Sequence, residues 1–527
     1  MKEIFGFVTR IIFFVTCLLA TIDTNLFVYP SLSRYLLLEL GIIILFVIGI
    51  FTLAVKKGRI ILSFHEIFII LWIFYIVLHG FTTQFVEYYR MYYICSTLFF
   101  IIILNTLFRY QLIKKTNIET VFLIIVTIQI FYVIGQWFGL VESNSKFFRI
   151  TGCNENPTVT ALFLTGCIPL IVTRIKMSRH GILYTTLLLL SLACIALLRC
   201  RTAYVGVFIE LIVYICLSYK YRICNWMLHP WRVTFICMCL LPVFVTVCMT
   251  LYNMKKDSAD GRLLIWKLSA QMILDKPHGY GYGLFEKNYN LIQVHYFANN
   301  NASVAEKQNA NFTMMPYNDY LEQGVEGGIL GMLFLFLFYV IMIKAAIMQK
   351  SIEATMLFCA FTIMSLTNFI YISVLPWLLL MCYSSMVIYE VEKVYSYPIP
   401  LLILSVLCIP LGVASLNITR MSLAQMKLKT LSIQDKPASD SQYQDLESQI
   451  GTSEAYWMKR AINNYKAKNY EKALQNIHAA RQYSSSPMLF LGEFHSLKHL
   501  GLIEQSRTYL DTLSLMIPYK HNFKSTK

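Results

Sequence analysis

The chain has 527 residues, of which 57% are hydrophobic and only 14% are charged. Soluble proteins average about 25% charged residues, so this composition excludes a string of soluble domains, and its apolar content excludes a disordered chain. Lys and Arg outnumber Asp and Glu by 45 to 29, which gives a net charge of +16. These basic residues are scattered between apolar runs and do not form the concentrated face typical of nucleic-acid binding. The composition therefore predicts an all-α, polytopic membrane protein.

Thirteen apolar runs are long enough to cross a membrane, since a spanning helix needs about 20 mostly apolar residues. The first is interrupted by Asp23 and lacks a convincing cleavage site, so we expect it to stay as an anchor. A short break separates the eleventh and twelfth runs, which leaves the count at twelve or thirteen. The predicted spans are 8–28, 35–55, 60–80, 91–108, 118–140, 158–176, 182–199, 203–219, 233–252, 326–347, 352–371, 373–391 and 398–416.

Basic residues gather in alternate loops, which predicts the orientation because loops rich in Lys and Arg stay in the cytoplasm. The basic loops are 56–59, 109–115, 173–179, 219–232 and 344–350. This parity places the long loop 253–325 on the external side. The tail lies on that side too if there are thirteen spans, and in the cytoplasm if there are twelve.

The composition changes sharply after the last span. Residues 1–416 form the predicted transmembrane domain, 417–452 a polar linker, and 453–527 a helical tail. The tail resembles a tetratricopeptide repeat, because Tyr470 and Glu504 occupy similar places 34 residues apart, which is the period of that repeat. It is expected to be either a docking surface for a partner or a small helical cap.

Two polar clusters precede predicted spans on the external side, where polar residues are costly and indicate function. In the first, 147–164, Arg149 precedes a turn whose Asn156 is equally suited to capping a helix. In the second, RCRTAYVG, Arg199 and Arg201 lie between two spans on the side where few arginines are expected. The planar guanidinium suits phosphate, so for these arginines we favour a functional role over snorkelling to lipid head groups.

Two further clusters lie in the long loop and at its end. Arg262 begins an amphipathic helix suited to the membrane surface, and His278 introduces a glycine-rich loop without the βαβ context of a nucleotide site. In the stretch 316–334, Asn318 and Asp319 can cap a helix whose glycines allow close packing. Glu326 lies in the same stretch, near the predicted membrane surface, and is a candidate functional carboxylate.

These clusters, in this order, resemble the O-antigen ligase and polymerase superfamily. That family shows a TG-x-x-NP-type turn and an SRTA-type motif between spans. Its long periplasmic loop then carries R-x-x-x-W, a P-x-x-G-x-G-type segment and HN-x-YL-x-x-x-E-x-G-x-x-G. The corresponding sequences here, over roughly 147–345, are TGCNENP, CRTAYVG, GRLLIW, PHGYGYGLF and YNDYLEQGVEGGILG.

The resemblance implies a membrane glycosyltransferase of the GT-C class in the bacterial inner membrane, with the long loop in the periplasm. Such enzymes move a glycan from undecaprenyl diphosphate to an acceptor and need no metal, nucleotide sugar or other cofactor. Arg201 and Arg262 would bind the diphosphate and stabilise its developing charge. Arg149, Arg199, Asn156, His278, Asn318 and Asp319 are the further candidates for substrate binding.

One residue departs from the family pattern, since Tyr317 replaces the histidine that precedes the Asn of the last motif. That histidine is thought to act as general base, and a phenol, which ordinarily titrates near pH 10, is a poor base at neutral pH. His278, His295, Asp319 and Glu326 are alternatives for the role.

The expected activity is O-antigen ligation to lipid A core. Polymerisation of repeat units and glycan transfer to protein Ser or Thr share the same motifs and stay open. A transporter for polyprenyl-linked glycans belongs to a different class and would show two similar halves with matching broken helices. The sequence shows no such symmetry.

Overall fold

The computed structural model describes residues 2–23, 26–29, 32–55, 60–83, 88–219, 256–299, 302–392, 396–399, 401–434 and 436–518. Over these residues the regular secondary structure is helical apart from one two-stranded ribbon. This confirms the predicted all-α polytopic membrane fold. The predicted span 233–252 and the basic loops 56–59 and 220–232 lie outside the described residues.

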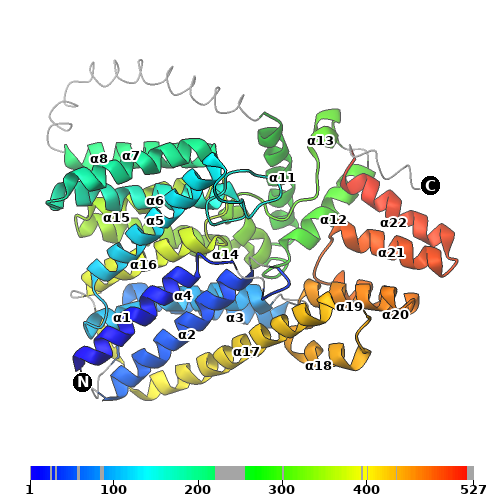
Figure 1. Ribbon diagram of the computed structural model, residues 1–527, viewed down its shortest axis with the longest axis horizontal. Coiled ribbons are helices and arrows are strands. Elements are labelled where there is room, and N and C mark those ends of the chain that lie inside the picture. The colour runs from blue at the N-terminus through cyan, green and yellow to red at the C-terminus, as the bar shows by residue number, and fades with distance from the viewer. Residues whose placement is uncertain are drawn as a thin grey trace.

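The helices of the first half run side by side (Figure 1). They are α1 (Lys2–Leu19), α2 (Leu32–Val55), α3 (Phe64–Thr82), α4 (Tyr88–Arg109), α5 (Lys115–Phe138), α6 (Pro157–Met177), α7 (Gly181–Leu198) and α8 (Arg201–Ser218). The second half adds α11 (Lys256–Asp275), α12 (Phe285–Ala298), α13 (Val304–Asn309), α14 (Asp319–Met348), α15 (Ile352–Met364), α16 (Val374–Glu392) and α17 (Leu401–Ile433). The tail contains α18 (Asp440–Ile450), α19 (Glu454–Lys466), α20 (Tyr470–Ala480), α21 (Pro487–His499) and α22 (Ile503–Met516).

Within the described ranges, nine helices are long and apolar enough to cross a membrane, namely α2 to α8, α14 and α16. Each corresponds to a predicted span. Three other predicted spans are helices with different bounds, and the one expected at 398–416 is the longer α17. The helix expected at 8–28 is α1 and ends at Leu19, before Asp23, and the helix expected at 352–371 is α15, which ends at Met364. The reason for the earlier end of α15 is a polar, non-helical segment, 365–373, which lies at the candidate site.

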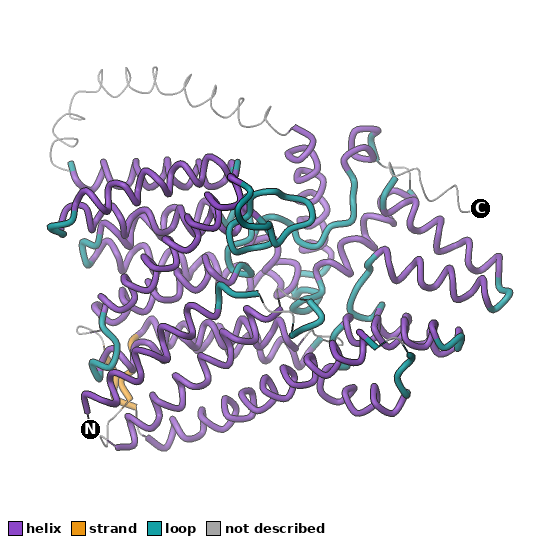
Figure 2. Tube along the Cα trace, viewed as in Figure 1, coloured by secondary structure: helices purple, strands orange, loops and turns teal. Residues whose placement is uncertain are grey.

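The stretch 417–452, expected as a linker, is helical over most of its length. Helix α17 continues to Ile433, and α18 covers Asp440–Ile450 (Figure 2). Polar composition indicated a linker, but a polar helix is stable where one of its faces packs. Here Leu428 and Leu431 of α17 lie in one apolar cluster with Tyr443 and Tyr456 of the tail.

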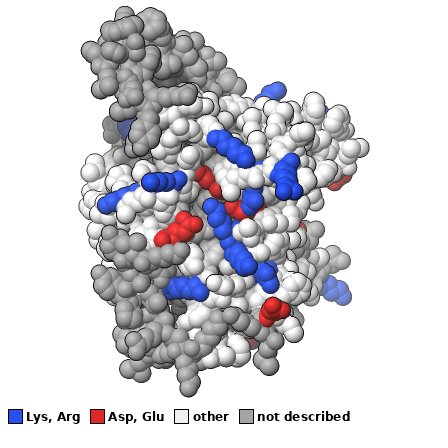
Figure 3. Space-filling model, turned by 90° about the vertical axis from the view of Figure 1, so that its left-hand side faces the viewer, with Lys and Arg blue, Asp and Glu red and all other residues white. Residues whose placement is uncertain are grey.

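Basic residues lie at one end of the helix bundle. The loops that contain Lys114, Lys176, Arg179 and Lys350 emerge at the left of Figure 1, and the space-filling view onto that side shows Lys and Arg spread across it, with Asp and Glu mainly near its centre (Figure 3). The ribbon of β1 (Ile60–Ser63) and β2 (Ser396–Ile399) lies at this end, with Ile60 opposite Ile399. We call this end the basic face and the other end the loop face.

The tail lies on the loop face. Lys287 of α12 donates to the carbonyl of Gln482 at 2.8 Å, and Gln293 donates to the carbonyl of Met516 at 2.9 Å. Helices α15 and α16 leave from and return to the basic face, so they do not affect the side on which the tail lies. Counting them as one span or two therefore does not change the end of the bundle at which the tail lies.

Helix α14 is interrupted at Gly328, whose backbone has φ 69° and ψ −173°. A broken helix frees carbonyl groups that need partners inside a membrane protein. The glycine-rich loop supplies them, since Tyr280 N–H donates to the Val325 carbonyl at 2.8 Å and Gly281 N–H donates to the Glu326 carbonyl at 2.9 Å. In return, Ile329 N–H donates to the Pro277 carbonyl at 2.9 Å. The PHGYGYGLF and EGGILG sequences are therefore two halves of one structural unit.

The close packing in this unit predicts that Gly279→Ala strongly lowers the free energy of unfolding. Gly279 has φ 86°, and a Cβ there would lie 2.5 Å from the backbone oxygen of Glu326. Gly139→Ala is the matched control, because Gly139 has φ 76° and open space around it. We expect the control to lower the free energy of unfolding by about 1–3 kcal/mol, the cost of left-handed backbone in other residues, and Gly279→Ala to lower it further. Thermal unfolding of the purified protein measures the difference, and equal effects would contradict the crowding.

Candidate functional site

The structure brings Arg201 and Arg262 together. Arg201 is the first residue of α8, and Arg262 projects from α11, where its Nη1 donates to the Thr367 carbonyl at 2.8 Å. Both side chains are half-buried. Burial lowers the pKa of Arg262, nearby Tyr317 opposes that shift, and Arg201 lowers the pKa further. Two like charges thus lie within electrostatic reach of each other, an arrangement that an anion stabilises.

Tyr317 lies directly against this pair. The Arg262 guanidinium carbon is 4.8 Å from the centroid of the Tyr317 ring, within the range of a cation–π contact. On its other side the Tyr317 ring approaches the Phe369 ring, with centroids 5.8 Å apart. The Tyr317 backbone has φ 53°, a left-handed conformation that is costly for a bulky residue. The residue before it is held by Trp266, whose indole N–H donates to the Pro316 carbonyl at 2.9 Å.

The non-helical segment 365–373 joins these elements. Its Thr367 hydroxyl lies 3.1 Å from that of Thr202, and Asn368 donates to the Thr202 hydroxyl at 3.2 Å, which ties it to the start of α8. Asp319, at the start of α14, accepts from the Ile370 N–H at 2.9 Å and from the Tyr371 N–H at 3.4 Å. Sequence reasoning noted only a short break between two spans here. The signal it missed was the polar pair Thr367-Asn368 inside an apolar run.

The TGCNENP turn before α6 is held from behind by two glutamines of α5. Gln136 accepts from the N–H groups of Thr151 and Gly152, both at 2.8 Å, and Gln129 accepts from the Cys153 N–H at 3.0 Å. Asn156 caps α6 by accepting from the Thr158 N–H at 2.9 Å. The motif is therefore a rigid turn, which fixes the start of α6 next to the start of α8.

Arg34 holds the TGCNENP turn in place, and the sequence analysis did not identify it. It is 5% exposed, and its Nη2 lies 2.7 Å from the Asp23 carboxylate. The same guanidinium also donates to the Asn154 side chain and to the Cys153 carbonyl. Asp23, which the sequence suggested was an interruption in a span, is the partner of a buried arginine that holds the TGCNENP turn.

Three predicted site residues are exposed and lie apart from these contacts. Arg149 donates to the Trp137 carbonyl at 3.2 Å, and Arg199 ends α7 in a left-handed conformation with φ 49°. The side chain of His278 is exposed as well, while its carbonyl lies 2.7 Å from the His79 ring.

The remaining predicted residues are buried and make structural contacts. Asn318 caps α14 through the N–H groups of Tyr320 and Leu321, at 3.0 and 3.1 Å. Glu326 lies 3.4 Å from the Phe285 N–H and 3.5 Å from the Tyr371 hydroxyl, so it links the glycine-rich loop to the segment 365–373. One turn earlier, Glu322 pairs with Arg90 at 2.7 Å. The side chains of Asn318, Glu322 and Glu326 therefore contact other parts of the protein. Of the predicted residues, Arg262 contacts Tyr317 and lies within electrostatic reach of Arg201.

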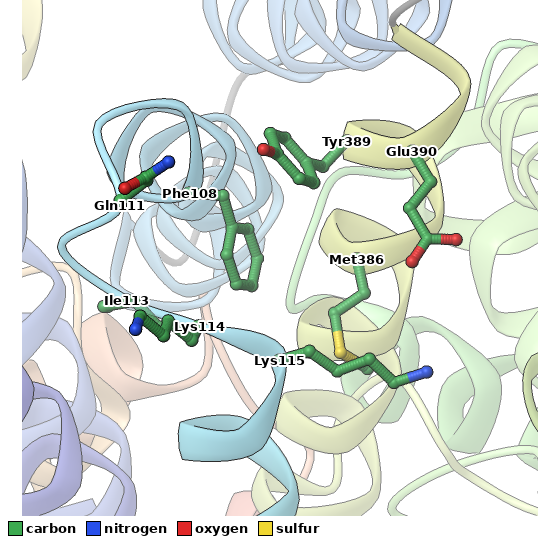
Figure 4. Close-up of a pocket in the computed structure, with 8 residues that line it drawn as sticks. All are labelled: Phe108, Gln111, Ile113, Lys114, Lys115, Met386, Tyr389 and Glu390. Carbon is green, nitrogen blue, oxygen red and sulfur yellow. The ribbon is translucent and has the colours of Figure 1, made fainter.

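A separate cavity opens on the basic face, far along the bundle from the two arginines. It has a volume of about 330 Å³ and lies between the end of α4, the start of α5 and the end of α16. Phe108, Met386 and Tyr389 form an apolar wall, while Lys114 and Lys115 leave the start of α5 in different directions (Figure 4). The cavity therefore takes no part in the arginine site.

Comparison with known proteins relates the second half of the membrane domain to one family. Residues 186–336 match the family model described as O-antigen ligase, a range that includes Arg199, Arg201, Arg262, Tyr317 and Glu326. The TGCNENP turn precedes the matched range. No curated protein matches the chain.

The contacts of Arg34 predict that the free energy of unfolding depends strongly on the pairing of Arg34 with Asp23. Arg34→Met should lower the free energy of unfolding by about 3–5 kcal/mol, because it leaves the Asp23 carboxylate without its buried partner. Adding Asp23→Asn should restore part of this loss, since no unpaired charge remains. Thermal unfolding of the two single variants and the double variant provides the measurement. A double variant as unstable as the sum of the single changes would contradict the pairing.

Proposed function

We propose that the chain, whose residues 186–336 match the O-antigen ligase family model, is a membrane glycosyltransferase that moves a glycan from undecaprenyl diphosphate to an acceptor. The family match supports a membrane glycan enzyme of O-antigen ligase or polymerase type. Among the acceptors of such enzymes we favour lipid A core, so that the reaction is O-antigen ligation.

The observation that carries the proposal is the contact of Arg262 with the Tyr317 ring, with Arg201 within electrostatic reach, inside the matched range. Arginine remains charged at physiological pH and binds phosphate oxygens through two parallel hydrogen bonds. One N–H group of Arg262 is used by the Thr367 carbonyl, which orients the guanidinium and leaves its other donors for a ligand. A diphosphate placed between the arginines relieves the repulsion between them.

The proposed reaction forms one bond and breaks one. The acceptor hydroxyl oxygen bonds to the anomeric carbon of the glycan, and the bond from that carbon to the diphosphate oxygen breaks. The two arginines stabilise the negative charge that develops on the leaving diphosphate, and the hydroxyl proton passes to a base. No metal takes part in this scheme, so EDTA should leave the transfer rate unchanged.

We place the enzyme in the bacterial inner membrane with the basic face in the cytoplasm, following the positive-inside rule. The loop face, the arginine pair and the tail are then periplasmic. The arginines also create a positive potential that attracts an anionic donor to this side.

Two sister reactions use the same chemistry with other acceptors. An O-antigen or exopolysaccharide polymerase transfers the glycan to a lipid-linked repeat unit, and a protein O-oligosaccharyltransferase transfers it to Ser or Thr. The tail beside the long loop suits a protein acceptor or an assembly partner equally well. A transporter of polyprenyl-linked glycans makes no bond and does not need the arginine pair.

The glycan profile of a strain that lacks the gene distinguishes these activities. Lipid A core without O-chains, together with accumulated lipid-linked polymer, supports the ligase. Core that carries a single repeat indicates the polymerase, and intact lipopolysaccharide with unglycosylated proteins indicates the protein glycosyltransferase. No change in lipopolysaccharide, capsule or glycoprotein would favour transport over transfer.

Replacing either arginine should abolish transfer without removing the protein from the membrane. We expect Arg201→Ala and Arg262→Ala to lower the transfer rate at least a hundredfold, comparable to the loss of one preorganised donor to a developing anion. Lys307→Ala, a cation elsewhere on the long loop, is the control. Transfer of labelled glycan in membranes with equal protein content measures the rate, and wild-type rates in both arginine variants would rule out the diphosphate role.

Tyr317 can act through its ring or through its hydroxyl, and two substitutions separate these roles. The contact with Arg262 involves the ring, so we expect Tyr317→Phe to keep the transfer rate within about tenfold and Tyr317→Ala to lose it, because only the second removes the cation–π contact. If Tyr317→Phe is as inactive as Tyr317→Ala in the same assay, the hydroxyl group takes the proton.

A further inference from the structure

The tail is attached to α12 by hydrogen bonds at both ends of that helix. Near its start, Glu286 Oε1 accepts from the N–H and hydroxyl groups of Ser485, at 3.0 and 2.8 Å. Near its end, Gln293 Nε2 donates to the Met516 carbonyl at 2.9 Å. Gln293 is 1% exposed, and so is Ser485. These contacts join the long loop to α21 and α22 along one line (Figure 1).

Apolar packing completes the contact between the tail and the loop. The tail contributes a small buried cluster of Phe490, Leu513, Met516 and Ile517. Three side chains of the long loop pack against it, namely Leu291 and Val294 of α12 and Phe312 from the segment that follows α13. The tail therefore touches the segment that leads to Tyr317 as well as the helix beside it.

The same face of α12 that holds the tail also holds this segment. Gln293 Nε2 donates to the Asn311 carbonyl at 3.2 Å in addition to Met516. Asn290 exchanges two hydrogen bonds with the backbone of Thr313, both at 2.9 Å. Because one amide group bridges the tail and the segment, the position of either depends on the other.

The segment needs such support because it ends in a strained residue. The left-handed backbone of Tyr317 costs about 1–3 kcal/mol and persists only where the surroundings hold it. Trp266 fixes the Pro316 carbonyl from the side of α11. The bonds to Asn311 and Thr313 fix the segment from the side of α12.

We propose that the tail is a clamp that holds segment 311–317 and thereby positions Tyr317 beneath Arg262, with Gln293 as the positioning residue. The tail is then an integral support of the site, and its release lowers the rate of the chemical step. The effect on transfer rests on the proposed function, whereas the effect on the segment does not.

Two variants of the full-length protein test the clamp. Gln293→Met removes the hydrogen bonds to Met516 and Asn311, and the one accepted from the Tyr289 hydroxyl, at nearly constant volume. Val294→Asp places a charge in the apolar contact. Arg507→Gln is the control, because Arg507 is exposed on α22. We expect both interface variants to speed hydrogen exchange in peptides covering 311–317 and to lower kcat about ten- to a hundredfold. The KM for the lipid-linked donor should change less than kcat, and the control should match the wild type.

The two measurements separate the clamp from the proposed function. Faster exchange in 311–317 with no transfer even by the wild type would support the clamp and overturn the proposed function. Normal exchange and normal kcat in both interface variants would overturn the clamp. Gln293 also bonds Asn311 directly, so Val294→Asp decides whether the tail itself is needed. If that variant speeds exchange in α19–α22 but not in 311–317, the clamp is overturned.

Discussion

The candidate site depends on one constraint, which is that backbone polar groups inside or beside a membrane must find partners within the protein. The chain leaves the helical state at several places in this part of the fold, among them the turn 151–156, Gly328 and the segment 365–373. Each interruption frees N–H and carbonyl groups. Gln129 and Gln136 accept hydrogen bonds from N–H groups of the turn 151–156, and the glycine-rich loop donates to carbonyl groups just before Gly328. Asp319 accepts from an N–H group of the segment 365–373. The motifs of the sequence are therefore mainly the means by which irregular backbone is kept stable.

Irregular backbone is useful here because it allows residues from distant parts of the chain to meet. Arg262 reaches the Thr367 carbonyl because the helix has ended there, since a carbonyl within a helix is already occupied. The same segment contacts the start of α8 through Thr202, which sets Arg201 beside Arg262. The charges of the site are few, and their placement is determined by hydrogen bonds among neutral groups.

The fold was largely predictable from the sequence, whereas the contacts within the site were only partly so. Apolar runs of about 20 residues identified all nine helices that can span a membrane within the described part of the chain. The resemblance to the O-antigen ligase superfamily pointed to Arg201, Arg262 and Tyr317, and the structure places Tyr317 against Arg262 with Arg201 within electrostatic reach. The roles of Arg34 and Asn368 could not be predicted, because each depends on a partner far away in the sequence, and the role of Asp23 follows from that of Arg34. Composition also failed at 417–433, where a polar stretch is helical because Leu428 and Leu431 pack.

The hairpin of α15 and α16 contributes to the surroundings of the arginines without changing the end of the bundle at which later segments lie. Both of its ends lie at the basic face, where Lys115 approaches Glu353 to 3.8 Å and the Tyr389 ring packs against Phe108. Its tip, 365–373, lies beneath the arginines. A change in the length of this tip alters the contacts of Arg262 and Thr202, but it leaves every later segment at the same end of the helix bundle. The surroundings of the two arginines can therefore diverge in evolution while the position of the tail is preserved.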